Sequence, residues 1–402
     1  MLKVFKLQKA YQILLIMLAF LMPLTVSGAN TIVVLICFTW LLSGNYKIKA
    51  KNIISSKVMI ASLMFYSVHL LGMIWTEDIK WGFHILHKMW YFLLFLPILF
   101  DIVKKEYVKY YISSFLLAIS FTEIVSYLVW FELIDPFKNA TVENPTPFMS
   151  HITYNPVLAF AIYLVLHEVF FNKNLSKFYF FVYSFFAATM SINMFITGGR
   201  AGQVMYFVAI IILIFQFFNT QKIKALLAVA FLLPSIFFIA YQTSPLFEKR
   251  VYLALNNISE YISQDQTYTS VGIRLTFAKN SWIAFKDHPI LGAGTGDFPS
   301  KYRQINEIES PSHPYATNPH NMYMLVLVQS GLIGLFSLFY FFYTQINFAV
   351  KNTSSRFYKD VGLTLPILFI VINLSDSYLL GHYTTLMYVF FSAFLYKDFE
   401  KY

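Results

Sequence analysis

The sequence predicts an all-α polytopic membrane protein with about twelve transmembrane helices. Of its 402 residues, 58% are hydrophobic and only 12% are charged, whereas about a quarter of an ordinary soluble domain is charged. The apolar residues are gathered in runs of about 20, the length at which a helix crosses the hydrocarbon core of a bilayer. These observations exclude a soluble multidomain enzyme.

Each predicted span corresponds to one apolar run. The first two runs are separated only by Ser27–Asn30, which predicts a tight helical hairpin at that turn. We divide the chain into N-terminal spans one to five (1–150), a core that includes a long outer loop (151–345), and two C-terminal spans (346–402). The runs cover approximately 11–28, 30–44, 58–75, 83–103, 110–131, 152–171, 178–196, 201–218, 223–241, 320–343, 361–378 and 382–396.

The positive charges predict the orientation. With twelve spans drawn, 19 of the 30 Lys and Arg residues fall in connections on one side, and such an excess marks the cytoplasmic side. Both termini are therefore expected in the cytoplasm. The net charge of +10 follows from this topology, and its dispersal among loops argues against nucleic-acid binding.

One outward connection, 242–319, is far longer than a usual loop and is polar, so it is expected to fold as a small external subdomain between spans nine and ten. Val271–His288 has helical apolar spacing, Leu291–Asp297 is a Gly-rich turn, and a second short amphipathic segment runs through Tyr302. The single cysteine, Cys37, lies inside the second span, so neither a disulfide nor a cysteine-based metal site is expected.

Thr197–Gly202 is the first candidate site, at the outward end of spans seven and eight. Gly199 and its neighbours allow close backbone approach, and Arg200 offers a planar fork of donors beside a helix N-terminus. Together these features predict an anion site. The alternative is that Arg200 only reaches the lipid headgroups of the membrane.

Asn318–Tyr323, entering span ten, is the second candidate. Pro319 suits the first turn of a helix, so His320 is expected near an N-terminus, where the dipole favours a neutral imidazole. Such a group can act as a general base. Asn321 and Tyr323 are candidate contacts to substrate. The alternative is a polar residue at a membrane boundary.

Arg274, on the external helix of the long loop, is the third candidate, and a surface charge is its ordinary explanation. His313 and Arg303, which precede the histidine motif, are candidate contacts to an acceptor. Lys88 clusters with two histidines at the outer end of span four and is a candidate headgroup or diphosphate contact. No metal site is expected there, because no carboxylate or thiolate accompanies the histidines.

Two other polar residues, Glu123 and Asp376, have an open role. Glu123 lies within span five, where a carboxylate is costly, and either pairs with a neighbour such as Asn193 or is protonated. Asp376 flanks the last outer turn and is explained by simple solvation. On the outward side, two arginines, a histidine and two helix N-termini are expected to converge on an anion. No nucleotide-binding motif occurs, so this anion is not expected to be a nucleotide. A lipid-borne diphosphate is the anion that such a site would meet.

Three segments resemble, in order and spacing, the signature of the O-antigen ligase and polymerase superfamily. They are TGGRAGQ at 197–203, RLTFAKNSWIAFKDHPILGAGTGDF at 274–298, and NPHNMYMLVLVQSGLIGL at 318–335, and the resemblance covers roughly 150–345. It implies a metal-independent, inverting glycosyltransferase that works at the periplasmic face without a cofactor. The implied partners are an undecaprenyl-diphosphate-linked glycan donor and a sugar hydroxyl of the lipid A core.

By this resemblance Arg200 and Arg274 bind the diphosphate leaving group, and His320 deprotonates or orients the acceptor hydroxyl. A glycan polymerase or a protein O-oligosaccharyltransferase shares the same motifs and remains an alternative. A transporter of lipid-linked glycans is disfavoured, because no internal repeat relates the two halves of the chain.

Overall fold

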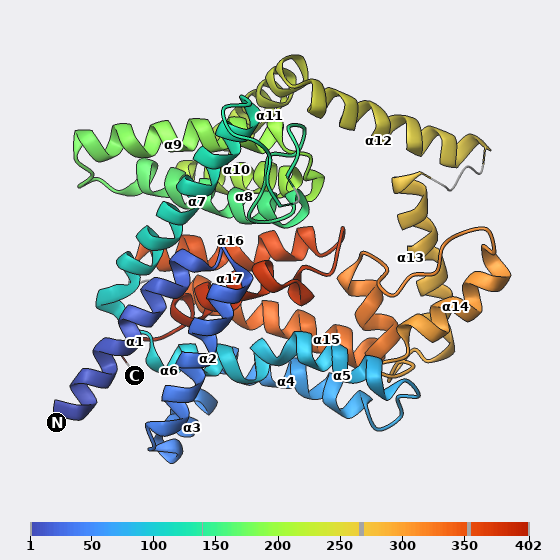
Figure 1. Cartoon of the computed structure of the whole chain (residues 1–402), viewed down its shortest axis with the longest axis horizontal. Helices are drawn as coiled ribbons and strands as arrows, with labels where there is room; N and C mark the ends of the chain where they lie inside the picture. The colour runs from blue at the N-terminus through green and yellow to red at the C-terminus, as the bar shows by residue number, and fades with distance from the viewer. Residues whose placement is uncertain (1, 139, 265–268, 352–354, 401–402) are drawn as a thin grey trace. The chain divides into compact units, whose positions relative to one another are not determined.

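The chain is all-helical in the computed structural model, which describes residues 2–138, 140–264, 269–351 and 355–400 (Figure 1). Within these ranges there is no strand, only an isolated β-bridge between Thr141 and Asn144. Seven of the described helices are long and apolar enough to cross a membrane, or eight if the bent pair Val26–Leu42 and Tyr46–Ile54 is one span. The predicted all-α polytopic membrane class is confirmed, and the number twelve stays a prediction.

The chain divides into two units, the first formed by Met1–Thr39 with Ile102–Tyr252 and the second by Trp40–Asp101 with Leu253–Tyr402. The chain passes between the units three times: within α2, Val26–Leu42, at the end of α6, Leu96–Ile102, and within α12, Pro245–Gln264. The first unit also contains α1 Leu2–Leu21, η2 Lys105–Tyr107, α7 Val108–Trp130, α8 His151–Phe171, α9 Lys177–Ile196, α10 Arg200–Phe218 and α11 Lys222–Thr243.

The predicted hairpin turn between the first two runs is misplaced by a few residues. Helix α1 ends at Leu21 and α2 begins at Val26. Pro23 lies in the break, where its ring and missing N–H oppose a continuous helix. Gly28, inside the predicted turn, is accommodated within α2 because a single glycine costs a helix only about 1 kcal/mol.

In the first unit α8 and α10 contact each other backbone to backbone. A Cβ on Gly202 would lie only 2.6 Å from the Pro156 backbone nitrogen, and one on Gly199 would lie 2.7 Å from Asn155 Cγ. The fully buried Asn155 links the two helices, because its amide donates to the Gly199 carbonyl (3.2 Å). The glycines of the first candidate site therefore serve helix packing.

The second unit contains the external helices and the C-terminal spans. As predicted, a helix covers most of Val271–His288, a Gly-rich turn follows, and a second short helix passes through Tyr302. Its elements are α3 Tyr46–Ile54, α4 Lys57–Gly72, α5 Ile79–Trp90, η1 Tyr91–Phe95, α6 Leu96–Ile102, α13 Ser270–Asp287, α14 Phe298–Glu309, α15 Met322–Lys351, α16 Arg356–Ile372, η3 Tyr378–Leu380 and α17 His382–Leu395.

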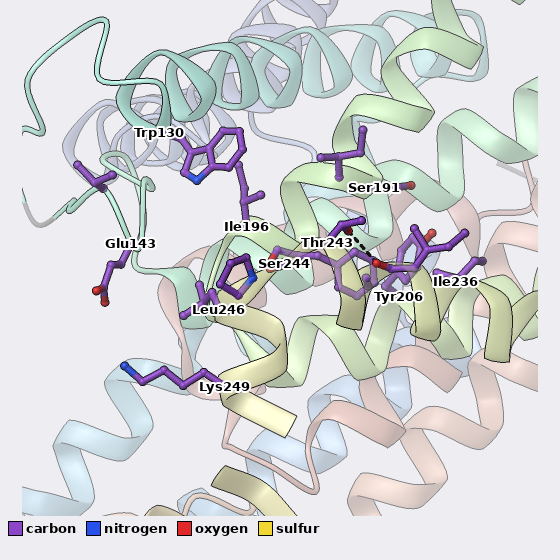
Figure 2. Close-up of a pocket in the computed structure, with 16 residues that line it drawn as sticks. Trp130, Glu143, Ser191, Ile196, Tyr206, Ile236, Thr243, Ser244, Leu246 and Lys249 are labelled. Atoms are coloured by element: carbon purple, nitrogen blue, oxygen red, sulfur yellow. Dashed lines mark hydrogen bonds between the residues drawn. The ribbon is translucent and has the colours of Figure 1, made fainter. Parts of the chain in front are cut away.

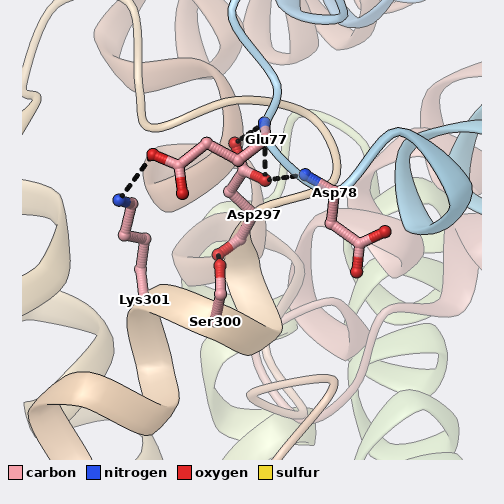
Figure 3. Close-up of polar contacts among 5 residues, drawn as sticks. All are labelled: Glu77, Asp78, Asp297, Ser300 and Lys301. Atoms are coloured by element: carbon pink, nitrogen blue, oxygen red, sulfur yellow. Dashed lines mark hydrogen bonds and ion pairs between the residues drawn. The ribbon is translucent and has the colours of Figure 1, made fainter.

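The Gly-rich turn docks on the connection between α4 and α5 (Figure 3). The carboxylate of Asp297, fully buried, accepts the backbone N–H groups of Glu77 (3.0 Å) and Asp78 (2.8 Å). Lys301 on α14 adds a 3.2 Å ion pair with the Glu77 side chain. These contacts hold the turn and the start of α14 in place, so the turn is structural, as its sequence indicated.

Helix α15 is sharply bent at Gly331, where φ is 61° and ψ is −157°. The rings of Tyr323 and Phe339 stack with centroids 5.5 Å apart, although a straight helix would separate these positions by about 24 Å. The Gly-rich turn supplies the hydrogen bonds lost at the bend, because Ala293 N–H donates to the Val328 carbonyl (2.8 Å). The predicted tenth span over 320–343 therefore falls on a helix with a sharp bend, which the sequence did not indicate.

Candidate functional site

His320 and Asp376 form the polar centre of the second unit. The His320 Nδ1 lies 3.2 Å from the Asp376 Oδ2, which makes an ion pair when the imidazole is protonated. Nδ1 is buried, yet the whole His320 side chain is 42% exposed. The accessible part of the ring therefore faces away from Asp376, and the pairing leaves Nε2 as the nitrogen available to a ligand.

The backbone around His320 is held in an unusual conformation. His320 has a φ of 51°, in the left-handed region that residues other than glycine rarely adopt. Its N–H donates to the Asn318 Oδ1 (2.9 Å), which also accepts the Ser377 hydroxyl (3.1 Å). Asn318 thus ties the histidine loop to the segment that carries Asp376, and such over-determined strain is typical of functional sites.

Arg274 belongs to the same group through α13. Phe277, one turn further along that helix, stacks on the His320 ring with centroids 6.1 Å apart and planes inclined by 18°. Burial alone would raise the pKa of Asp376, but the adjacent His320 ring, the Ser377 N–H and the charge of Arg274 together lower that pKa below its usual value. The structure therefore brings Arg274, His320 and Asp376 together, and the catalytic roles expected of Arg274 and His320 stay predictions.

Asn321 and Tyr323 hold the histidine loop in place. Asn321 Oδ1 accepts the N–H groups of Tyr323 (3.0 Å) and Met324 (3.1 Å), which caps α15, and its amide donates to the Leu374 carbonyl (3.1 Å). The Tyr323 hydroxyl donates to the Ile370 carbonyl (2.6 Å), and its ring is buried. These contacts account for both residues, and contact with substrate stays a prediction.

The remaining candidates of this unit are His313, Arg303 and Lys88, and their contacts involve residues other than His320 and Asp376. His313 is buried, and the Arg303 guanidinium lies over the Tyr315 ring, 5.0 Å from its centroid. Lys88 is on α5, which packs against η3, the segment just after Asp376. Within the described ranges no group of three or more His, Cys, Asp and Glu residues is arranged to hold a metal ion.

Arg200 is the first residue of α10, in the first unit, as predicted. The loop before it is held by Asn144, whose Oδ1 accepts the Gly198 N–H (3.1 Å). A second arginine is beside this loop: Arg250 Nη2 lies 3.2 Å from the point that a Cβ on Gly198 would occupy. Its Nε is buried and has no hydrogen-bond acceptor among the described residues.

Glu123, also in the first unit, is buried on α7 without a hydrogen-bond partner for either carboxylate oxygen in the described structure. The suggested partner, Asn193, is engaged elsewhere: it accepts from the Tyr154 hydroxyl and donates to the Ser126 hydroxyl, both at 3.0 Å. Pairing of Glu123 with Asn193 is therefore wrong.

Sequence reasoning missed Asp376 and Arg250. The sequence alone explains Asp376 by solvation, whereas the structure pairs it with His320. The signal that could have found it is its place in a turn expected on the same side of the membrane as His320. Arg250 directly follows Lys249 in the long loop, and nothing in the sequence indicated that the chain returns there to the Thr197–Gly202 segment.

Residues 185–339 match the family described as O-antigen ligase. This match supports the resemblance to the O-antigen ligase superfamily. A Haemophilus influenzae relative, named only as an uncharacterized protein, is 27% identical over 315 residues, which cover 75% of this chain and 74% of the relative. The matched segment of the ligase family contains Arg200, Arg274 and His320, whereas Asp376 lies beyond it.

Proposed function

We propose that this chain transfers an O-antigen glycan from undecaprenyl diphosphate to a sugar hydroxyl of the lipid A core. The reaction would take place at the periplasmic face of the inner membrane. The observation that carries the proposal is the His320–Asp376 pair beside Arg274, formed just before α15 and just after α16 and within reach of solvent. A base next to a cation is what the departure of a diphosphate from a sugar requires.

In the proposed step the acceptor oxygen attacks the anomeric carbon, and the bond from that carbon to the diphosphate oxygen breaks. His320 takes the acceptor proton on Nε2, and the carboxylate of Asp376 holds the ring and stabilises the imidazolium. Arg274 and Arg200 stabilise the negative charge that moves onto the leaving diphosphate. Attack from the face opposite the leaving group inverts the anomeric centre.

Deletion of the gene, read on a lipopolysaccharide gel, distinguishes the activities within the superfamily. Loss of a ligase leaves bare core while lipid-linked O-antigen accumulates. Loss of a polymerase leaves core capped with a single repeat, and loss of a protein O-oligosaccharyltransferase leaves the ladder intact. Either of the last two results would replace the ligase proposal with that alternative.

Complementation with variants tests the residues. We expect His320→Ala and Arg200→Ala to abolish ligation, because they remove a base worth about 10² to 10⁴ in rate and a leaving-group contact. Arg356→Ala, at the opposite end of α16 from Asp376, and His288→Ala, at the exposed end of α13, are matched controls that should ligate normally. Immunoblots of membrane fractions check insertion. Near-normal ligation by either inserted active-site variant refutes the assignment.

A further inference from the structure

The first unit contains an apolar pocket next to the Arg200 loop. Its volume is about 970 Å³, at the upper end of the roughly 300–1,000 Å³ typical of ligand pockets. The walls come from the C-terminal ends of α7, α9 and α11, from α10, from the first turn of α12 and from Val142 and Glu143 (Figure 2). Ile196, which lines the pocket, immediately precedes the Thr197–Gly202 segment.

The polar side chains of the wall offer little to a polar ligand, because they are bonded within the protein. The Ser191 hydroxyl donates to the Ala187 carbonyl, and the Thr243 hydroxyl donates to the Ile239 carbonyl, both at 2.7 Å. The buried Ser244 hydroxyl, just after α11, donates to the Phe195 carbonyl of α9, also at 2.7 Å. A hydrocarbon chain therefore fits this pocket better than a sugar, whose hydroxyls would lack partners.

Charge is confined to one side of the pocket. Glu143 and Lys249 lie together on that side, and Tyr206 and Ile236 lie on the opposite side (Figure 2). Arg250 directly follows Lys249, its Nη2 lies beside Gly198, 3.2 Å from where a Cβ would be, and its buried Nε has no hydrogen-bond acceptor among the described residues. An arginine with an unpaired buried donor is well suited to bind a phosphate oxygen.

We propose that this pocket holds the part of a polyprenyl chain next to its diphosphate, and that Arg250 binds that diphosphate together with Arg200. The inference rests on the proposed function and adds to it the residues that hold the lipid of the donor. The apolar interior of the pocket suits an isoprenoid chain, and the positive charges of Lys249 and Arg250 at one side of it suit the diphosphate at the end of that chain. Glu143 is the one acidic lining residue, and Lys249 beside it offsets its charge.

The test is photolabelling of the full-length protein in nanodiscs with a diazirine-bearing farnesyl diphosphate, without any acceptor. The labelled peptides are mapped by mass spectrometry. We expect labels on the pocket walls that undecaprenyl diphosphate displaces and that farnesol and phosphatidylglycerol do not displace. Displacement by phosphatidylglycerol at equal concentration would identify an ordinary phospholipid site and overturn the proposal, as would labelling elsewhere on the chain.

Two pairs of variants sharpen the result. Ile239→Trp fills the pocket from an exposed wall position and should reduce labelling at least about tenfold, whereas Phe238→Trp, its exposed neighbour outside the pocket, should not. Arg250→Ala should weaken binding of the diphosphate probe by about 10- to 100-fold, and Arg250→Lys should weaken it less. Unchanged binding in Ile239→Trp or Arg250→Ala overturns the proposal.

Binding is measured here without glycan transfer, so the two proposals can fail separately. Pocket labelling in a protein that transfers no glycan would refute the proposed function and leave the lipid site standing. Normal ligation by a protein that is not labelled in the pocket would refute the lipid site alone.

Discussion

Gly331→Ala tests whether the bend in α15 positions His320. The glycine has a φ of 61° and a ψ of −157°, a region that is essentially restricted to glycine and costs other residues about 1–3 kcal/mol. The added Cβ would also lie 2.5 Å from the Ile290 carbonyl carbon and 2.7 Å from the Gly292 nitrogen. Because both atoms are backbone, relief requires movement of the Gly-rich turn, at about 1–3 kcal/mol more.

The two effects together should lower the free energy of unfolding by about 2–6 kcal/mol, a large part of the roughly 5–15 kcal/mol that usually stabilises a domain. We expect Gly331→Ala to insert in the membrane, to lower the midpoint of thermal unfolding in detergent, and to abolish ligation. Gly362→Ala is the matched control within α16. A Cβ there would meet only Ala349 Cβ at 3.3 Å and Tyr396 Cε1 at 3.5 Å, and the backbone needs no positive φ.

The assay follows thermal aggregation of the purified protein by size-exclusion chromatography and ligation on a lipopolysaccharide gel. Ligation at the unmodified level by Gly331→Ala, with an unchanged midpoint, would show that the bend is not needed to place His320. If Gly362→Ala lowers the unfolding midpoint and ligation as much as Gly331→Ala does, the cause is the added volume of a methyl group in the second unit rather than loss of the bend.

Three further changes probe single contacts. Asp376→Asn should reduce ligation about 10- to 100-fold, which is part of what a general base contributes. The pKa of Asp376 is lowered in the folded protein, so its charge contributes fully to stability above its unfolded pKa of about 3.9 and is lost only as pH falls through the lowered, folded pKa. Asp376 should therefore not titrate in a pH–activity profile between about pH 5 and 8. Asp297→Ala leaves the N–H groups of Glu77 and Asp78 unpaired and should destabilise the protein by about 1–3 kcal/mol, measured as a lower unfolding midpoint. Glu123→Leu should raise that midpoint and preserve ligation, because an unpaired carboxylate is removed from a buried site; a lower midpoint would reveal a partner for Glu123.

The helices were predictable because their signal is local. Apolar runs of membrane-spanning length and the amphipathic spacing of α13 are written in consecutive residues, and each run contains a helix in the structure. The bend at Gly331 was not predictable in this way. It depends on Pro289–Ala293, about 40 residues earlier, which provide the hydrogen bonds that replace those of the broken helix. A glycine inside an apolar run, read alone, indicates only a small local cost.

The candidate site was predictable in part for the same reason. His320 and Arg274 each stood out within a short motif, and the topology placed both outside. Asp376 carried no motif of its own, and only the docking of the Leu374–Ser377 turn on the histidine loop pairs it with His320. Asn321 and Tyr323 show the converse, because residues inside a motif can be needed for the shape of the loop rather than for contact with a ligand.

The two units suggest a division of labour that kinetics can separate. Arg250 and the apolar pocket lie in the first unit and, as proposed, act only on the donor lipid, so their loss should raise the donor KM and spare kcat at saturation. His320 and Asp376 lie in the second unit and, as proposed, act on the proton that moves in the reaction, so their loss should lower kcat. Arg200 is in the first unit but is assigned to the leaving group, whose charge grows in the transition state. Its loss should therefore change both parameters, which separates it from Arg250 although the two arginines adjoin the same loop.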